Sequence, residues 1–391
     1  MEGRSGTEFE GGRPPGRRAP ERAVLVGLRL PKQPRWEAEE ALGELQQLTR
    51  SAGANPCETV LQERQSPDPR TFIGSGKVDD LRRVCANGVD LVIFDDDLSG
   101  TQQRNLEERI GCRVIDRTGL ILDIFAQRAR TKEGKLQVEL AQLQYFLPRL
   151  TGQWSHLERL GGGIGTRGPG ETQLEVDRRR IRHRIAKIQE ELKKVRRHRA
   201  LLRSPRKRRG VPTAALVGYT SAGKSSLLNA LTGAGVAIAG RLFSTLDPTT
   251  RQVVLPGGGV FLLTDTVGFI RKLPHQLVVS FKATLEEVVE ADILLHVINA
   301  AHPHWPEQRR SVEGVLGELG VLTKPTLTVY NKVDLLDCEE LSALQRRRGK
   351  GHIAVSAKTG AGLTELLEAL ANILADVSHA GSGGVPAGAG A

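Results

Sequence analysis

Hydrophobic positions in the first third of the chain alternate between short apolar runs and stretches in which apolar residues recur every three or four positions. The short runs are typical of buried β-strands, and the longer stretches are typical of amphipathic helices. The pattern predicts helices at residues 36–51, 77–86 and 101–110, separated by strands at residues 23–30, 59–63, 90–95 and 113–116. Because such alternation forms parallel sheets, we predict a small parallel α/β domain over residues 21–130.

Two later stretches carry apolar residues with a seven-residue step, which is the spacing of a narrow seam on a long helix. The first seam consists of Leu136, Leu143 and Leu150, together with Leu140 and Leu147. The second seam consists of Leu174, Ile181, Ile188, Val195 and Leu202, with Ile185 and Leu192 on the adjacent line. Pro148 ends or kinks the first helix, because proline has no N–H for a helical hydrogen bond. Two such seams bury each other when the helices pair, so we predict an antiparallel helical hairpin over residues 131–210.

The connection between these helices, residues 161–171, contains six glycines and one proline. One interpretation is a plain flexible linker. The other is a loop whose bare backbone, together with Arg167, presses against another backbone such as that of RNA. We favour the second interpretation, because a hairpin tip needs only a few residues and long connections tend to be functional or disordered.

The two ends of the chain contain few hydrophobic side chains that a folded core could bury. Residues 1–20 are rich in Gly, Pro and Arg, and residues 378–391 are rich in Gly and Ala. We expect a disordered leader and a disordered tail. Residues 211–377 remain for a third domain, in which apolar runs again precede helical patterns. The predicted fold class is α/β, with a parallel N-terminal domain, a helical hairpin and a C-terminal domain with a mixed sheet.

The 391-residue chain has a formal net charge of +11, and the excess lies in the second hairpin helix. Residues 178–209 contain sixteen Lys or Arg and two Glu, a local charge of +14, so the remainder of the chain is slightly acidic. A solvated charged face is one interpretation. The density of cations, above all at Arg206, Lys207, Arg208 and Arg209, favours contact with RNA phosphates.

No apolar stretch approaches the roughly 20 residues of a membrane-spanning helix, so the sequence predicts no transmembrane segment. The four cysteines are Cys57, Cys85, Cys112 and Cys338, and no two of them form a C-x-x-C pair. Their wide spacing argues against a zinc site and against a disulfide framework. We expect a monomeric protein in the reducing cytoplasm.

The most informative motif is GYTSAGKS at residues 218–225, which lies between an apolar run and a helical pattern, the strand-loop-helix setting of a phosphate-binding loop. Backbone N–H groups of such a loop surround the phosphates, Lys224 reaches the β- and γ-phosphates, and the Ser225 hydroxyl binds Mg²⁺. The predicted nucleotide contacts are Gly218, Tyr219, Thr220, Ser221, Ala222, Gly223, Lys224 and Ser225.

Two further segments follow in the order that a GTPase needs. FSTLDPTTR, residues 243–251, has the position of a switch segment that supplies a Thr hydroxyl to Mg²⁺. Its predicted contacts are Phe243, Ser244, Thr245, Leu246 and Asp247. In DTVG, we expect Asp265 to hold Mg²⁺ through water and the Gly268 amide to contact the γ-phosphate. The predicted contacts of this motif are Asp265, Thr266, Val267 and Gly268.

The base is identified by NKVD, which follows an apolar run at residues 326–330. The two carboxylate oxygens of Asp334 match two adjacent donors on the guanine edge, and adenine offers no such pair. The contacts predicted here are Asn331, Lys332, Val333 and Asp334. SAK supplies the loop that covers the base, with Ser356, Ala357 and Lys358. The substrate is therefore GTP.

Within this set, the candidate catalytic residues are Lys224, Thr245 and Gly268. Phe269 follows DTVG directly, where many GTPases have a water-orienting Gln. A phenyl ring neither accepts a hydrogen bond from the attacking water nor donates one, so we predict slow intrinsic hydrolysis. A partner then accelerates the reaction by ordering residues 243–251.

Three weaker patterns are interpreted as structural. FIGSGK at residues 72–77 resembles part of a phosphate cradle but lacks the full spacing, and a tight turn is the better interpretation. The run Asp95, Asp96 and Asp97 has the oxygens for Mg²⁺ without a neighbouring ligand signal, and we interpret it as a solvated loop. The histidines have no metal-binding or catalytic spacing.

Taken together, residues 116–150 and 161–180, the phosphate-binding loop, FSTLDPTTR and DTVGFI resemble the HflX family of ribosome-associated GTPases, and the resemblance runs from about residue 24 to residue 374. It implies that the chain binds the large ribosomal subunit and its RNA and, as in bacterial members, splits stalled or idle ribosomes. It also implies that Ser225 and Thr245 are the Mg²⁺ ligands. Ser221 stands where the family usually has Asn, which in related GTPases helps to hold an activating potassium ion.

Two functions fit these residues. The first is a GTPase that dissociates or rescues ribosomes. The second is a regulatory GTPase switch, for example in ribosome assembly, that binds RNA or protein without splitting ribosomes. Both use the same GTPase residues, so the sequence alone does not separate them.

Overall fold

The structure, a computed structural model, describes residues 20–151, 173–208, 211–233, 242–243, 245–272, 282–346 and 351–382. Its N-terminal domain is the parallel α/β unit that the hydrophobic pattern predicts. The four strands pair in the order β2-β1-β3-β4, all parallel. The elements in chain order are β1 (Arg22–Arg29), α1 (Arg35–Ala52), β2 (Asn55–Glu63), α2 (Ser75–Cys85), β3 (Leu91–Phe94), α3 (Gly100–Ile110), β4 (Arg113–Asp116) and α4 (Arg117–Arg128).

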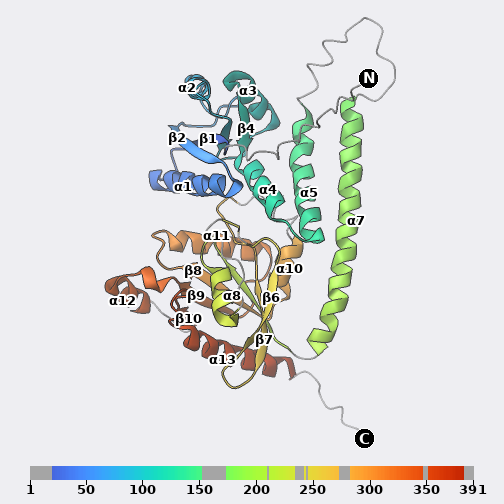
Figure 1. Ribbon diagram of the computed structural model, residues 1–391, viewed down its shortest axis with the longest axis vertical. Coiled ribbons are helices and arrows are strands. Elements are labelled where there is room, and N and C mark those ends of the chain that lie inside the picture. The colour runs from blue at the N-terminus through green and yellow to red at the C-terminus, as the bar shows by residue number, and fades with distance from the viewer. Residues whose placement is uncertain are drawn as a thin grey trace, which may run out of the picture.

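Local sequence explains where these helices begin and end. Ser99 and Gln102 form a capping box at the start of α3, and Gly111 ends that helix with a left-handed φ of 81°. Helices cover both faces of the sheet (Figure 1): α2 and α3 lie on its outer face, and α1 lies between the sheet and the C-terminal domain. The turn expected at residues 72–77 lies earlier in the chain, between Asp68 and Phe72, which pair as a β-bridge, and residues 75–77 already form the first turn of α2.

The predicted hairpin consists of α5 (Lys132–Phe146) and α7 (Gln173–Arg208), with a short 3₁₀ helix η1 (Leu147–Thr151) at the position of Pro148. The two apolar seams pack on each other through a buried cluster made of Leu136, Leu140, Ile188 and Leu192. The helices are antiparallel, because Glu133 near the start of α5 pairs with Arg199 late in α7, whereas Glu139 pairs with Arg184. Residues 161–171, the glycine-rich connection, lie outside the described residues.

The C-terminal domain has a six-stranded mixed sheet in the order β10-β9-β8-β5-β7-β6, in which only β6 runs antiparallel to its neighbour. Its elements in chain order are β5 (Thr213–Gly218), α8 (Lys224–Thr232), β6 (Thr249–Val254), β7 (Val260–Asp265), α10 (Lys282–Glu290), β8 (Ile293–Asn299), α11 (Trp305–Glu318), β9 (Thr326–Asn331), the 3₁₀ helix η2 (Val333–Leu335), α12 (Cys338–Arg346), β10 (His352–Ala354) and α13 (Leu363–Ser382). The α/β fold class is thus confirmed.

One apolar core joins the domains. It contains Leu25 of β1, Phe125 of α4 and Leu285 of α10, which come from the N-terminal and C-terminal domains. Phe125 meets Phe243 edge to face, with ring centroids 4.7 Å apart. The N-terminal domain therefore lies on top of the C-terminal domain, and α7 runs along one side of both (Figure 1).

The last helix differs from the prediction. We expected a disordered tail from residue 378, but α13 continues to Ser382. Residues 375–380 are helix-compatible, because the glycine-rich composition begins only at Gly381. Residues 1–19 and 383–391 lie outside the described part of the chain. Within the described residues, no helix combines the length and hydrophobicity needed to cross a membrane.

Candidate functional site

The predicted phosphate-binding loop connects β5 to α8, as its sequence setting requires. Gly218 and Gly223 both have positive φ, of 152° and 94°. A Cβ atom at Gly218 would collide with the Val297 carbonyl, and one at Gly223 would collide with the Asn331 side-chain amide. Glycine is therefore the residue that fits at both ends of the loop. The loop closes around the N-terminus of α8, where backbone N–H groups favour an anion.

Lys224 is buried beneath this loop. Its Nζ donates to the carbonyl oxygens of Gly218 at 3.0 Å and Tyr219 at 2.9 Å. Burial lowers the pKa of Lys224 to about 8, and the nearby Asp265 carboxylate opposes this effect. Phosphate oxygens beside the ammonium group would favour its charged form, so the site is electrostatically suited to a polyphosphate.

Three side-chain oxygen atoms that could bind a metal ion, from Ser225, Thr245 and Asp265, lie close together next to Lys224. The hydroxyls of Ser225 and Thr245 lie 2.8 Å apart, and each donates to Asp265 Oδ2, at 2.6 and 2.7 Å. The other oxygen, Asp265 Oδ1, is buried and has no hydrogen-bond partner among the residues that the structure describes. Mg²⁺ prefers hard oxygen ligands, and an unsatisfied buried carboxylate oxygen is a group that a bound cation or its water would satisfy. These residues therefore fit Mg²⁺.

DTVG is held directly against the phosphate-binding loop. The Thr220 amide donates to the Phe269 carbonyl at 2.7 Å, and the Phe269 amide donates to the Gly218 carbonyl at 3.1 Å. A Cβ atom at Gly268 would approach the Thr220 side chain to 2.8 Å and Lys224 Nζ to 3.0 Å. Gly268 thus brings its backbone close to the γ-phosphate position. The Phe269 side chain is buried in the core, so it offers nothing to an attacking water.

NKVD and SAK, the motifs predicted to bind guanine, also meet. Asn331 Nδ2 donates to the Ala222 carbonyl at 2.9 Å, and Asn331 Oδ1 accepts from the Ala357 amide at 3.0 Å, which ties the phosphate-binding loop to the SAK loop. Ser356 donates to Asp334 Oδ1 at 2.6 Å, while Asp334 itself is exposed. One carboxylate oxygen is thus oriented by the protein, and the group remains accessible to a base.

Other residues of these motifs have different environments. Lys332 has a left-handed φ of 66°, and burial lowers its pKa. Lys358 is exposed, whereas Thr266 and Val267 are buried in the domain core. The Thr266 hydroxyl donates to the Leu216 carbonyl at 2.6 Å. The side chains of Thr266 and Val267 therefore support the site from below.

The switch segment divides between two locations. Thr245 lies beside Ser225 and Asp265, but Phe243 and Leu246 are buried in the core between the domains. Asp247 points to the start of α5, where its carboxylate accepts from the Thr131 hydroxyl at 2.5 Å and from the amides of Arg130 and Thr131 at 3.0 and 3.1 Å. Of the predicted contacts in this segment, only Thr245 is brought to the phosphate site, and Ser244 lies outside the described residues.

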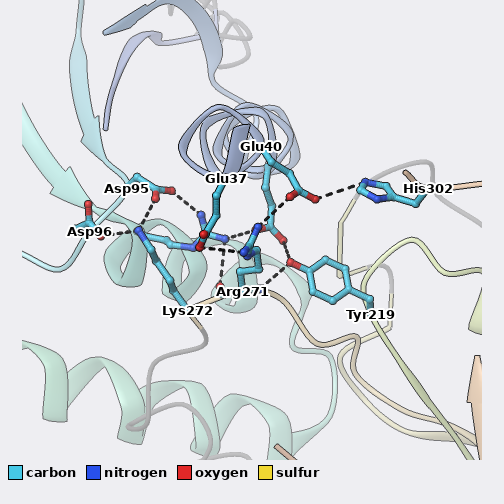
Figure 2. A network of polar contacts seen from close by, with 10 residues as sticks. Glu37, Glu40, Asp95, Asp96, Tyr219, Arg271, Lys272 and His302 are labelled. Carbon is cyan, nitrogen blue, oxygen red and sulfur yellow. Dashed lines mark hydrogen bonds and ion pairs between the residues drawn. The ribbon is translucent and has the colours of Figure 1, made fainter. Parts of the chain in front are cut away.

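Sequence reasoning missed a polar network between the domains (Figure 2). Tyr219 of the phosphate-binding loop donates to Glu44 of α1 at 2.7 Å, and the Tyr219 hydroxyl accepts from the Arg271 amide at 2.7 Å. The Arg271 side chain pairs with Glu37 at 3.0 Å and with Glu40 at 2.9 Å. The Tyr219 side chain thus points to the N-terminal domain, and the segment after DTVG is bound there too.

The acidic run Asp95, Asp96 and Asp97 belongs to this region, so its interpretation as a solvated loop was wrong. Asp95 is buried and pairs with Arg117 and Lys272, both at 2.7 Å. Asp96 also pairs with Lys272, at 2.5 Å. The partner Lys272 lies in another domain and far along the chain, so the local sequence of the acidic run carried no sign of it.

Comparison with known proteins agrees with this geometry. Family models described as "GTP-binding GTPase N-terminal", "GTP-binding GTPase Middle Region" and "50S ribosome-binding GTPase" match residues 39–126, 128–206 and 213–332. A protein named GTPase HflX from Caldanaerobacter subterraneus subsp. tengcongensis is 52% identical over 351 residues, covering 90% of this chain and 80% of the relative. GTPase HflX of Escherichia coli K12 is 50% identical over 354 residues, covering 90% of this chain and 82% of the relative.

Among solved structures, the crystal structure of a complex of SsGBP with GDP has a similar fold. Its TM-score is 0.52 and its sequence identity 25%, with 92% of this chain and 99% of that chain covered.

Proposed function

This chain belongs to the HflX family of GTPases, and we propose that it uses GTP binding and hydrolysis to control an attachment to the large ribosomal subunit, dissociating or rescuing stalled or idle ribosomes. GTP is bound and hydrolysed by the C-terminal domain. The attachment is supported by the description of the family model at residues 213–332, which names 50S ribosome binding. We place this activity in the cytoplasm and assign it to a monomer.

In the proposed site, the phosphate-binding loop and Lys224 hold the phosphates, and Gly268 donates its amide to the γ-phosphate. Ser225, Thr245 and, through water, Asp265 would hold Mg²⁺, which neutralises charge on the β- and γ-phosphates when bound. Asp334 identifies guanine. Since Phe269 is buried and apolar, positioning of the attacking water is left to a group outside this set.

The observation that carries the proposal is the short distance in sequence between two contacts. Thr245 reaches the proposed Mg²⁺ position, and Asp247, two residues later, binds Arg130 and Thr131 directly before α5. A change at the γ-phosphate that moves Thr245 therefore pulls on the hairpin. We propose that GTP holds this segment and fixes the angle between the hairpin and the C-terminal domain, and that hydrolysis releases both and lowers ribosomal affinity.

The basic helix α7 supplies the surface for RNA in this proposal. Along its described length, Arg182, Lys187, Lys194 and Arg197 are exposed. A row of cations on a long helix suits the phosphate backbone of RNA. The glycine-rich segment 161–171, which connects the two hairpin helices in the sequence, is proposed to press its backbone against ribosomal RNA.

Single-turnover GTP hydrolysis with and without purified large subunits tests this attachment. We expect slow hydrolysis by the protein alone and much faster hydrolysis with large subunits, because docking completes the site beside Phe269. Replacing Gly165 and Gly168 by Val should leave GTP affinity and the slow basal rate intact and lower only the stimulated rate. Equal stimulation of both proteins would show that the segment is merely a linker, and no stimulation of the wild type would contradict the attachment itself.

A further inference from the structure

Two of the four cysteines, 27 residues apart in sequence, meet on the outer side of the N-terminal domain. Cys85 is the last residue of α2, and Cys112 follows Gly111, which ends α3. The Cys112 thiol donates to the Cys85 sulfur, with 3.1 Å between the two sulfur atoms. Both are free cysteines. The wide spacing in the sequence gave no sign of this pair.

The surroundings of the pair allow a covalent bond to form. Sulfur atoms in a disulfide are about 2.05 Å apart, so Cys85 and Cys112 need to approach by only about 1 Å. Each lies at the end of an element, and element ends adjust at lower cost than their centres. The two cysteines differ in their exposure to solvent, since Cys85 is 8% exposed whereas Cys112 is only partly buried.

We propose that Cys85 and Cys112 are a site of reversible oxidation, at which a peroxide converts the two thiols into an intramolecular disulfide. The Cys112 sulfur attacks one peroxide oxygen, the O–O bond breaks, and Cys112 sulfenic acid and water form. The Cys85 sulfur then attacks the Cys112 sulfur, the S–O bond breaks, and a second water leaves with the Cys85 proton. One hydrogen peroxide and two thiols thus yield one disulfide and two waters, and a dithiol reverses the change by exchange.

The pKa values of the two thiols determine the rate at which the disulfide forms. Burial raises the pKa of the Cys112 thiol, and burial raises that of Cys85 to about 12. The thiolate is the reactive form, so little of either sulfur reacts at neutral pH. The disulfide therefore forms slowly under sustained oxidation, and its rate rises with pH.

The bond would stabilise the N-terminal domain without touching the nucleotide site. It joins the end of α2 to the start of β4 and encloses β3 and α3 in one loop, which restricts the unfolded chain. Cys85 packs in the core on the outer face of the sheet, together with Val24 and Phe94. Apolar contacts with the C-terminal domain come from the opposite core, and polar contacts come from α1 and from Asp95 and Asp96 after β3. Thermal stability should rise on oxidation, while GTP affinity stays the same.

Thiol counting on the full chain tests the proposal. A Cys57→Ser/Cys338→Ser variant keeps only the pair, since those exposed cysteines are not part of it. After prolonged treatment with hydrogen peroxide, both remaining thiols should be lost without formation of covalent dimers, dithiothreitol should restore them, and the midpoint of thermal unfolding should be higher in the oxidised form. In the same background, Cys85→Ser should give Cys112 sulfenic acid and no intramolecular disulfide.

Peptide mapping of the unmutated chain after oxidation is a second measurement that does not depend on the folding of the Ser variants. A linked pair of peptides containing Cys85 and Cys112 supports the proposal. Two titratable thiols in the oxidised Cys57→Ser/Cys338→Ser variant, or links between chains only in the unmutated chain, would overturn it and leave the pair as ordinary core packing.

Discussion

At the scale of single residues, Asp334 is the residue that we propose selects guanine. Ser356 orients one of its oxygens from 2.6 Å, and the carboxylate is exposed to the base position. Asp334→Asn should relax guanine selectivity and weaken GTP binding by about 1–3 kcal/mol, because the guanine donors lose their matched acceptors. Competition binding with GTP, ATP and XTP measures this change. Equal affinity of the wild type for ATP and GTP would contradict the assignment of NKVD.

The burial of Lys224 predicts that the stability of the nucleotide-free protein depends on pH. Its pKa is lowered by burial to about 8 in the folded state, compared with 10.5 for an ordinary lysine. Between these values the unfolded chain binds more protons than the folded one, so stability rises as pH increases from about 8 to 10.5. Relative to a Lys224→Met variant, the wild type should gain on the order of 3 kcal/mol over this range.

Chemical denaturation of both proteins at several alkaline pH values measures this difference, and the variant cancels the titration of all other groups. Saturating GTP should abolish the effect in the wild type, because phosphate charge favours the protonated lysine in the folded state. A difference that does not change with pH would show that Lys224 remains fully charged without nucleotide.

At the scale of elements, Asp247 connects the switch segment to α5. Asp247→Asn removes a charged acceptor from the Arg130 amide and from Thr131, the N-cap residue of that helix. We expect GTP affinity to change by less than about twofold, because Asp247 does not reach the phosphate site. The amides of residues 130–135 should lose their nucleotide-dependent protection from hydrogen exchange.

The control for Asp247→Asn is Asp177→Asn, which removes an i,i+3 partner of Arg180 on α7. This variant should retain the difference in hydrogen exchange between the GTP-analogue and GDP states. If the Asp247 variant retained it as well, the hairpin would be coupled to the nucleotide by another route.

The basic face of helix α7 leads to a prediction about how binding to large subunits depends on salt concentration. Replacing the exposed Arg182, Lys187, Lys194 and Arg197 by Gln should weaken binding to large subunits and flatten its dependence on salt concentration, since each lost phosphate contact lowers the slope by roughly one unit. GTP binding should not change. Arg82 and Arg83 on α2, also exposed, serve as a matched pair for comparison. If the slope of binding affinity against salt concentration did not change, the basic face of α7 would be a solvated surface that does not contact RNA.

The elements themselves were largely predictable from the sequence. Strand β1 and helix α1, for example, begin and end within a residue or so of the expected limits, because their hydrophobic periods differ and their packing is local. Helix α13 continues past residue 378, where we expected a disordered tail, because the glycine-rich composition begins only at Gly381. The path of residues 243–247 was not predictable, since Phe243 and Asp247 bind elements that precede them by more than 100 residues.

At the scale of the whole molecule, the phosphate site was predictable and the domain interface was not. Lys224, Ser225 and Asp265 follow from motifs in which short-range geometry is determined by neighbouring residues. The interface depends on pairs such as Lys272 with Asp95, in which each partner looks like an ordinary surface charge in the sequence. Only the folded chain shows that the N-terminal domain binds the segment after DTVG.

The central claim is that GTP drives this protein to separate ribosomal subunits, and sucrose-gradient profiles of whole ribosomes test it most directly. Whole ribosomes incubated with the protein and GTP should shift into separate subunits, with the protein in the large-subunit fraction; with GDP the ribosomes should remain intact. Intact ribosomes under both conditions, with the protein still bound to large subunits, would contradict the claim and identify a regulatory GTPase switch that binds RNA without splitting ribosomes.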